Sequence, residues 1–168
     1  MMTQLENILS RRSVRSYLEK EVETEKLEKI LKAAEYAPTG RNSQPLFFVI
    51  VKDKEKKDAI LKEAGVEKNF YSAPVIRITF ARTEDHLNEL NVGAALRNAR
   101  LEANELNVSS CWIHSAVSAL DTPHRRKFLK ETLSLKGEYH VFDCLALGYL
   151  KGEKPARKER NLDEDKIP

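Results

Sequence analysis

Glycine is scarce in this sequence, with only six in 168 residues, and none of them lies in a known nucleotide-binding spacing. The GxGxxG loop of dinucleotide-binding folds and the GxxxxGKS or GxxxxGKT loop of P-loop proteins are both missing. The motifs HExxH, CxxC and GxSxG are missing too, which excludes the zinc proteases, dithiol centres and serine hydrolases that depend on them. If the chain is an enzyme, we expect its chemistry to come from a bound cofactor.

Cysteines and long apolar runs are also few. The two cysteines, Cys111 and Cys144, cannot form a disulfide framework, and we expect both to be reduced thiols in buried strands of a cytoplasmic protein. No stretch approaches the roughly 20 apolar residues needed to cross a bilayer, and the N-terminal sequence lacks the apolar run of a secretory signal. The sequence therefore predicts no membrane partner.

Neither sign of charge is in large excess. Lysine and arginine total 29 against 26 aspartates and glutamates, which gives a formal net charge of +3. This excess is too small to indicate a nucleic-acid-binding protein. The content of 41% hydrophobic and 33% charged residues is that of a globular protein, and the length suits one domain over residues 1–168.

Hydrophobic periodicity predicts helices and strands in alternation. The expected helices are Val22–Ala37, the Lys-rich segment between Asp53 and Gly65, Thr83–Leu106, and Asp121–Leu133. The expected strands are Leu46–Val51, Pro74–Phe80, Ser110–His114 and Tyr139–Leu150. Thr24 is placed to cap the first helix, and the continuous apolar run Leu46–Val51 is typical of a buried strand. This order of elements predicts an α+β fold around a small sheet.

Three polar segments are unusual for a plain structural domain. Ser10–Ser16 holds three arginines and three serines, and arginine forks suit phosphate or planar carbonyl groups. Ala37–Pro45 carries amides and hydroxyls that suit the edge of a heteroaromatic ring or a sugar chain. The third segment is the basic tail after Lys151. Composition alone leaves a second interpretation open for each, namely a solvated basic stretch, ordinary turn chemistry and a solvated tail.

The histidines do not predict a metal site. Cys111 and His114 would point to opposite faces if both lie in one extended strand, so we do not expect them to share a metal ion. The run His124–Lys127 lies on an amphipathic helix, where a solvated face is favoured over a nucleic-acid contact.

Together, the polar segments resemble the motifs of the nitroreductase family of FMN-dependent oxidoreductases. The resemblance extends over nearly the whole chain and depends on five motifs that occur in the family's order. They are Arg11–Tyr17 (RRSVRSY), Ala37–Pro45 (APTGRNSQP), Val92–Asn98 (VGAALRN) ahead of Ser110–Ile113 (SCWI), Leu147–Tyr149 (LGY), and the Lys158-x-Arg160 tail. Each motif is weak alone, but the ordered set is a strong indication.

The resemblance implies a three-layer α+β fold, with a mostly antiparallel sheet between helices, in a homodimer with FMN at the subunit interface. It also implies the cofactor contacts. Matched by position, they are Arg11, Arg12 and Ser13 at the phosphate and ribityl end, Arg15 at the pyrimidine edge, Pro38, Thr39, Asn42 and Gln44 in the loop from the other subunit, Trp112 and Ile113 along the isoalloxazine ring, and Lys158 and Arg160 as a phosphate clamp.

The activity that the resemblance implies is FMN-dependent NAD(P)H oxidation. NADH or NADPH would reduce the flavin and leave, and a nitroaromatic or quinone would then take the hydride from flavin N5. This reaction needs no protein nucleophile, in agreement with the missing catalytic motifs. The alternatives are a specialised flavin reductase or dehalogenase-like reductase, and a flavin-binding dimer without turnover. His114 stands where the family often has glycine, and would either contact the flavin or be a partly buried strand residue.

Overall fold

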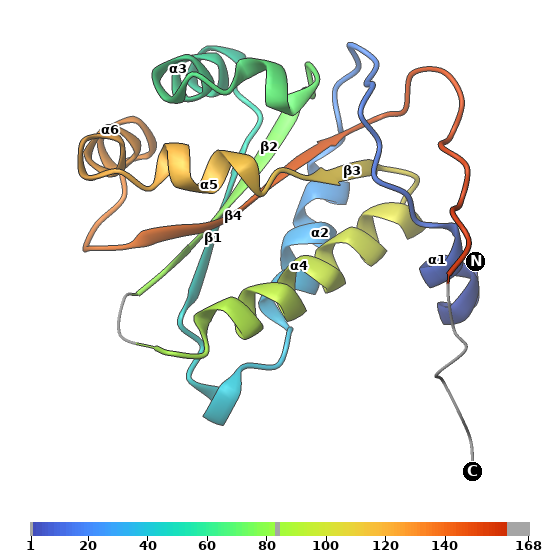
Figure 1. The fold of residues 1–168 in the computed structure, drawn as a ribbon, viewed down its shortest axis with the longest axis horizontal. Coiled ribbons are helices and arrows are strands. Elements are labelled where there is room, and N and C mark those ends of the chain that lie inside the picture. The colour runs from blue at the N-terminus through green and yellow to red at the C-terminus, as the bar shows by residue number, and fades with distance from the viewer. Residues whose placement is uncertain (1, 83–84, 161–168) are drawn as a thin grey trace.

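An antiparallel sheet lies at the centre of the computed structural model, which describes residues 2–82 and 85–160 (Figure 1). Its strands are β1 (Leu46–Val51), β2 (Val75–Ala81), β3 (Ser109–Trp112) and β4 (His140–Gly148). Their order across the sheet is β1-β2-β4-β3, and all three neighbouring pairs are antiparallel. Strands β2 and β4 are therefore central, and β1 and β3 form the edges.

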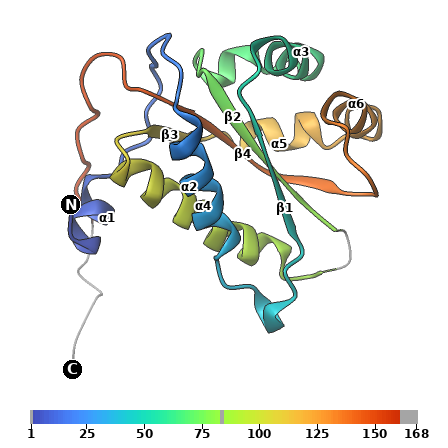
Figure 2. The ribbon, with the colours of Figure 1, turned by 180° about the vertical axis from the view of Figure 1, so that it is seen from behind.

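The helices form two groups that lie on opposite faces of the sheet, as the two opposed views in Figures 1 and 2 show. They are α1 (Gln4–Ser10), α2 (Thr24–Glu35), α3 (Lys54–Ala64), α4 (Asn88–Glu105), α5 (Ser115–Leu120) and α6 (Pro123–Leu133). Two short 3-10 turns, η1 (Gly40–Asn42) and η2 (Glu67–Phe70), complete the set. Within the described part of the chain, no helix is both long and apolar enough to span a membrane.

The alternation of side chains along β2 explains the two layers of helices. Ile76 and Ile78 belong to the apolar cluster that β2 forms with α3, α5 and α6. Val75 points the other way and packs with Leu145 and Leu147 in the cluster that includes α2 and α4. All of β2 is buried, because both faces of this central strand are covered. The predicted α+β fold, with an antiparallel sheet flanked by helices, is confirmed.

Helix α3 has both of the predicted boundaries. The Asp53 side chain accepts a hydrogen bond from Lys56 N at 2.8 Å, which caps the start of the helix. Gly65 follows the last turn with φ 67°, the left-handed conformation that glycine adopts without strain.

Two other helix starts differ from the prediction. The N-cap of α2 is Glu23, so the prediction that Thr24 caps this helix is wrong. The Thr24 hydroxyl instead accepts a hydrogen bond from Lys52 Nζ at 2.8 Å. Helix α4 begins at Asn88, and the predicted start, Thr83, lies outside the described residues.

Strand β1 has the predicted bounds, but the prediction that it is buried is wrong. It is an edge strand, so only Val51 is fully buried and Phe47 is 36% exposed. The Phe47 ring packs against the rings of Phe80 and Tyr139, with centroids 5.8 and 5.5 Å away. A continuous apolar run does not distinguish an edge strand from a central one, because both can pack apolar side chains on two faces.

Strand β3 is shorter than predicted, because it ends at Trp112. His114 has helical φ and ψ angles of −60° and −36° and is the N-cap residue of α5, a helix that we did not predict. Its side chain is exposed, so the interpretation as a partly buried strand histidine is wrong. The argument that Cys111 and His114 point to opposite faces of one strand no longer applies.

One ion pair is fully buried between the sheet and the layer of α2 and α4. Arg77 of β2 donates through Nη2 to the carboxylate of Asp143 on β4, and both side chains are 0% exposed. Thr79 also donates to this carboxylate, at 3.3 Å, and the guanidinium lies 5.3 Å from the centre of the Phe48 ring. The Nε and Nη1 atoms of Arg77 have no partner within the described residues.

An N-terminal arm, residues 11–17, extends the sheet beyond β3. Val14 N donates to Ser110 O of β3 at 3.1 Å. Tyr17 forms an isolated bridge with Leu150, where the chain leaves β4. The arm therefore lies between the edge of the sheet and the C-terminal tail, residues 151–160.

Candidate functional site

Arg11 lies where α1 ends and the N-terminal arm begins. Its side chain is partly buried, and its Nε and Nη1 atoms have no hydrogen-bond partner in the described part of the chain. Burial lowers the pKa of Arg11, and the neighbouring guanidinium groups of Arg97, Arg12 and Arg160 lower it further. A partly buried, unpaired cation among like charges favours a bound anion.

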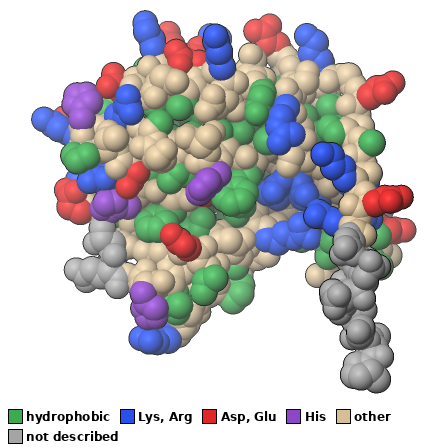
Figure 3. Space-filling view, viewed as in Figure 1, with side chains coloured by type: hydrophobic (Ala, Val, Ile, Leu, Met, Phe, Trp, Pro, Cys, Tyr) green, Lys and Arg blue, Asp and Glu red, His purple; other side chains and the backbone are tan. Residues whose placement is uncertain are grey.

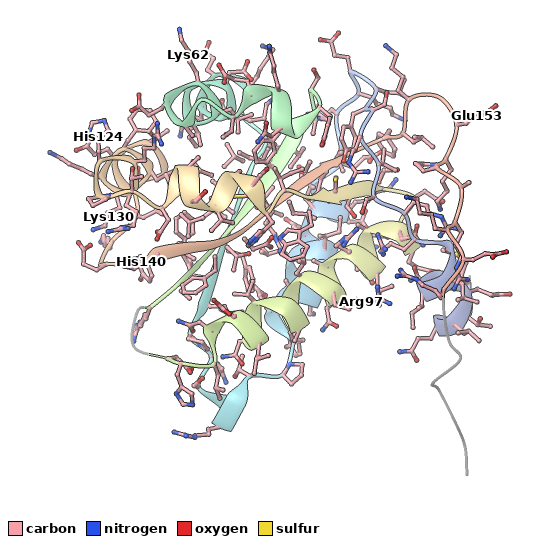
Figure 4. All side chains as sticks on the ribbon, in the orientation of Figure 1. Lys62, Arg97, His124, Lys130, His140 and Glu153 are labelled. Carbon is pink, nitrogen blue, oxygen red and sulfur yellow. The ribbon has the colours of Figure 1, made fainter. Side chains whose placement is uncertain are left out.

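Two arginines of α4 face Arg11, and neither was among the predicted cofactor ligands. Arg100 donates through Nη2 to Ser13 Oγ at 2.9 Å, and its buried Nε has no partner among the described residues. Burial lowers the pKa of Arg100 to about 10, with a further contribution from Arg11. Arg97 lies one turn earlier on α4 (Figure 4) and is exposed. We call Arg11, Arg97 and Arg100 the arginine cluster.

Arg12 holds the tail against the N-terminal arm. Its Nε donates to Pro155 O at 3.1 Å, although these residues are 143 positions apart in the sequence. Its Nη1 donates to the carbonyls of Leu9 and Arg11, at 2.7 and 2.9 Å. These three hydrogen bonds fix the Arg12 side chain between α1 and the tail.

The tail adds more cations to the arginine cluster. Burial lowers the pKa of Lys154, and the charges of Arg12 and Arg11 lower it further, which places Lys154 beside them. Lys158 and Arg160 are exposed, and Arg160 lies close enough to Arg11 to lower its pKa. Figure 3 shows Lys and Arg side chains gathered on this side of the molecule. Residues 11–15 and the tail, residues 151–160, thus lie in one basic region.

An exposed aromatic side chain lies at the end of β3. Trp112, the only tryptophan of the sequence, is 45% exposed, and its ring centre is 5.2 Å from that of His114. The side chain of Ile113 is buried, and its backbone N donates to β4 at 2.8 Å. Arg15 is exposed on the arm beside β3, and its charge counteracts the raised pKa that burial gives Cys111.

The loop after Pro38 connects α2 to β1 and is internally hydrogen-bonded. Gln44 N donates to Thr39 Oγ1, and Gln44 Nε2 donates to Asn42 Oδ1, both at 3.1 Å. Arg41, Asn42 and Gln44 have positive φ values of 56°, 53° and 48°. Non-glycine residues rarely adopt this conformation, and such strained segments cluster at functional sites.

The same loop is anchored to the N-terminal end of α4. Gly40 N donates to Asn91 Oδ1 at 2.9 Å, and Ser43 Oγ donates to Asp85 Oδ2 at 2.7 Å. Gly40 approaches Leu87 so closely that a Cβ atom at this position would lie 2.2 Å from Leu87 Cδ1. The loop is therefore held in a defined conformation, although most of its residues are exposed.

The loop and the arginine cluster do not meet within one chain. The loop contacts α4 at Asn91, whereas Arg100 lies nine residues further on, which is about 13 Å along the helix axis. Figure 1 likewise shows η1 and α1 at opposite ends of α4. The structure thus brings the predicted ligands together in two separate groups, with Arg11–Arg15, Trp112 and the tail in one, and the loop in the other.

Comparisons with known proteins give a consistent result. A family model described as the nitroreductase family matches residues 8–69. A protein of Archaeoglobus fulgidus, provisionally named NADH dehydrogenase/NAD(P)H nitroreductase, is 33% identical over 155 residues, which cover 89% of this chain and 87% of that protein. A Bacillus subtilis protein named FMN reductase (NADPH) is 28% identical over 92% of this chain and 70% of its own length.

Among solved structures, the fold is similar to that of a nitroreductase with bound FMN from Bacteroides fragilis. The TM-score is 0.88 at 27% sequence identity, and the match covers 100% of both chains. The similarity therefore includes the arm, the loop and the tail as well as the sheet.

Proposed function

Because this chain belongs to the nitroreductase family, we propose that it binds FMN and acts as an NAD(P)H-dependent oxidoreductase. NADH or NADPH is the electron donor, and an electron-poor molecule such as a nitroaromatic or a quinone is the acceptor. The two substrates bind in turn, in a ping-pong reaction. Residues 1–168 form a single domain in this proposal. A cytoplasmic location is also proposed, and the free thiols of Cys111 and Cys144 support it.

The observation that carries the proposal is the set of unpaired guanidinium donors in the arginine cluster. Arg11 leaves Nε and Nη1 without a partner among the described residues, and Arg100 leaves Nε. FMN ends in a phosphate monoester, whose charged oxygens accept hydrogen bonds from arginine. The donors that the protein leaves unpaired therefore suit the phosphate of FMN.

The other cofactor ligands are proposed from the family resemblance. The ligands that we propose are Arg11, Arg12, Ser13, Lys158 and Arg160 toward the phosphate and ribityl chain, Arg15 toward the pyrimidine edge, and Trp112 and Ile113 along the ring. We add Arg97 and Arg100 to the ligands proposed for the phosphate, since they carry positive charge beside Arg11.

The bound FMN supplies a ring that accepts a hydride and passes it on. The residues of this chain bind and orient that ring. Arg15 supplies a guanidinium that stabilises negative charge at the pyrimidine edge. Arg12 keeps the tail in place through its hydrogen bond to Pro155 O, so that Lys158 and Arg160 stay near the arginine cluster.

We also propose that the protein is a homodimer, with the loop of one subunit completing the site of the other. The separation of the loop from the arginine cluster supports this arrangement. So does the exposure of the loop, because Asn42 and Gln44 are exposed while their side chains are held by the hydrogen bond between them.

The spectrum of the purified protein tests this function. We expect flavin absorption bands that bleach when NADPH or NADH is added without oxygen, and that return when a nitroaromatic or quinone is added. Bands that persist with both nucleotides would favour a flavin-binding dimer without turnover. If free flavin is the only acceptor that is reduced, the protein is better described as a flavin reductase. If only halogenated acceptors are reduced, a dehalogenase-like reductase is favoured. The absence of any bands after incubation with FMN would contradict the proposal.

The role of Arg15 is tested by comparing two alanine variants. Arg15→Ala should weaken FMN binding by about tenfold or more, the typical worth of one hydrogen bond to a charged group. Arg126→Ala is the matched control, because Arg126 lies on α6 and pairs with Asp121 at 3.3 Å. FMN affinity is measured from the quenching of flavin fluorescence. Equal and negligible effects of both substitutions would refute the placement of Arg15 at the pyrimidine edge.

A further inference from the structure

A cleft with a volume of about 790 Å³ lies between α3 and the segment that leads from the arm to α2. Its floor is apolar, with contributions from Leu61, Phe70 and Val75, and its rim is charged. Lys62, on α3 at this end of the molecule, is one of the rim residues (Figure 4). Among the described residues, the lining of the cleft includes none of the cofactor ligands proposed above.

Lys57 contributes a buried cation to this cleft. The residue is only 8% exposed, although it lies among the exposed lysines of α3. Its Nζ atom donates to Ala73 O at 3.1 Å and lies 3.2 Å from Asp58 Oδ1. An ammonium group has three donors, so one N–H is left for a group inside the cleft.

The acidic side chains nearest to Lys57 are already paired. Asp58 is shared between Lys57 and Lys54, whose Nζ lies 2.7 Å from the other carboxylate oxygen, so these three charges sum to +1. Glu21 on the rim lies 3.6 Å from Lys52. The remaining acidic side chains of the rim are exposed, where solvent and salt screen them. The inner part of the cleft therefore favours a negative charge.

We propose that this cleft binds a small organic anion, namely a monocarboxylate with an aromatic or aliphatic body. The carboxylate would accept a hydrogen bond from Lys57 Nζ, and the body would lie on the apolar floor. The volume of about 790 Å³ is within the range of small-molecule pockets, which combine an apolar lining with a few polar anchors. A buried charge is stabilised only where it has a partner, and Lys57 provides that partner.

A matched pair of probes tests the proposal on the FMN-loaded protein. Binding of 4-fluorophenylacetate and of the uncharged 4-fluorophenylacetamide is measured by fluorine NMR line broadening. We expect the acid to bind about tenfold or more tightly than the amide, because only the acid makes a charge-assisted hydrogen bond. Equal affinities, or no binding of the acid, would overturn the proposal.

Two variants assign the binding to this cleft rather than to the cofactor site. Lys57→Met keeps most of the side-chain volume and should reduce acid binding about tenfold, without affecting FMN retention. Lys56→Met is the control on the same helix, because Lys56 is exposed and does not line the cleft, and it should change nothing. Acid binding that survives in Lys57→Met would overturn the proposal.

Asp58→Asn tests the role of Lys57 through an expected increase in acid binding instead of a decrease. It removes the carboxylate that competes for Lys57, so acid binding should increase by about threefold or more, while amide binding stays constant. This result does not depend on whether Lys57→Met folds. Unchanged or weaker binding of the acid to Asp58→Asn would count against Lys57 as the anchor.

Discussion

Replacing Arg11 with methionine is expected to weaken FMN binding by about two orders of magnitude. Arg11 has two buried donors, Nε and Nη1, without partners among the described residues. Each hydrogen bond to a charged group is worth about 1.5–3 kcal/mol, so the loss of two corresponds to about a hundredfold or more in the dissociation constant. Methionine keeps the apolar stem of the side chain, so that the change removes mainly the guanidinium group.

The same substitution should stabilise the protein when FMN is absent. Burial and the neighbouring guanidinium groups lower the pKa of Arg11, which means that folding disfavours its charged form. A group whose pKa is lower in the folded state than in the unfolded state destabilises the fold at every pH at which it carries its positive charge, including neutral pH. Removing Arg11 should therefore raise the melting temperature of the FMN-free protein, by about 2–4 °C for each kcal/mol gained.

Arg125→Met is the matched control for both effects. Arg125 donates to Glu63 O at 3.1 Å and to Ala119 O at 2.8 Å, so its guanidinium group is used inside the fold. Its replacement should lower the melting temperature and leave FMN affinity unchanged. The two variants are compared by calorimetry and by FMN titration. If Arg11→Met binds FMN as tightly as the wild type, or melts at a lower temperature without FMN, Arg11 does not hold the phosphate.

The second large effect that we expect is a loss of stability when the buried ion pair of the sheet is broken. Asp143→Ala should lower the free energy of unfolding by about 3–5 kcal/mol, because it leaves Arg77 charged and unpaired between the sheet and the helices. Thr79 would also lose the acceptor of its hydrogen bond. Urea denaturation, followed by circular dichroism, measures the change.

A double variant shows whether the lost stability comes from the unpaired charge of Arg77 or from other effects of replacing Asp143. Arg77→Met combined with Asp143→Leu replaces both charges by apolar side chains and should recover most of the lost stability. The two single substitutions would then be strongly non-additive, as expected for residues in direct contact. If the destabilisation by the double variant equals the sum of the two single effects, the burial of an unpaired charge is not the cause.

Those parts of the fold that depend on local sequence were predictable. The cap residues Asp53 and Gly65 fix α3, because their side-chain and backbone preferences act within one turn of the helix. The exposure of Phe47 on β1 was not predictable, because it depends on the position of the strand at the edge of the sheet. The conformation of His114 was missed for a similar reason, since the short helix α5 that follows it has only six residues to show a periodicity.

In the candidate site, too, the residues that are close in the sequence could be predicted, whereas those brought together only by packing could not. The arginines and Ser13 of the arm, and the amides of the loop, stand close together in the sequence and were predicted as ligands from their chemistry and from the family resemblance. Arg97 and Arg100 were missed, although their spacing places them on one side of α4. Their importance becomes visible only when the arm packs beside them and Arg100 donates to Ser13.

The hydrogen bond between Arg12 and the tail has a consequence for the order of events during synthesis. The basic region is assembled from residues near both ends of the sequence, and the two partners of this bond are separated by 143 positions. Contacts of such long range form late, because the intervening chain must be made and closed into a loop first. Strand β4, which pairs with both β2 and β3, ends at Gly148, shortly before Pro155, so a nascent chain completes its sheet only just before the tail emerges from the ribosome. If Lys158 and Arg160 hold the phosphate as we propose, tight FMN binding follows the completion of the sheet and does not assist it.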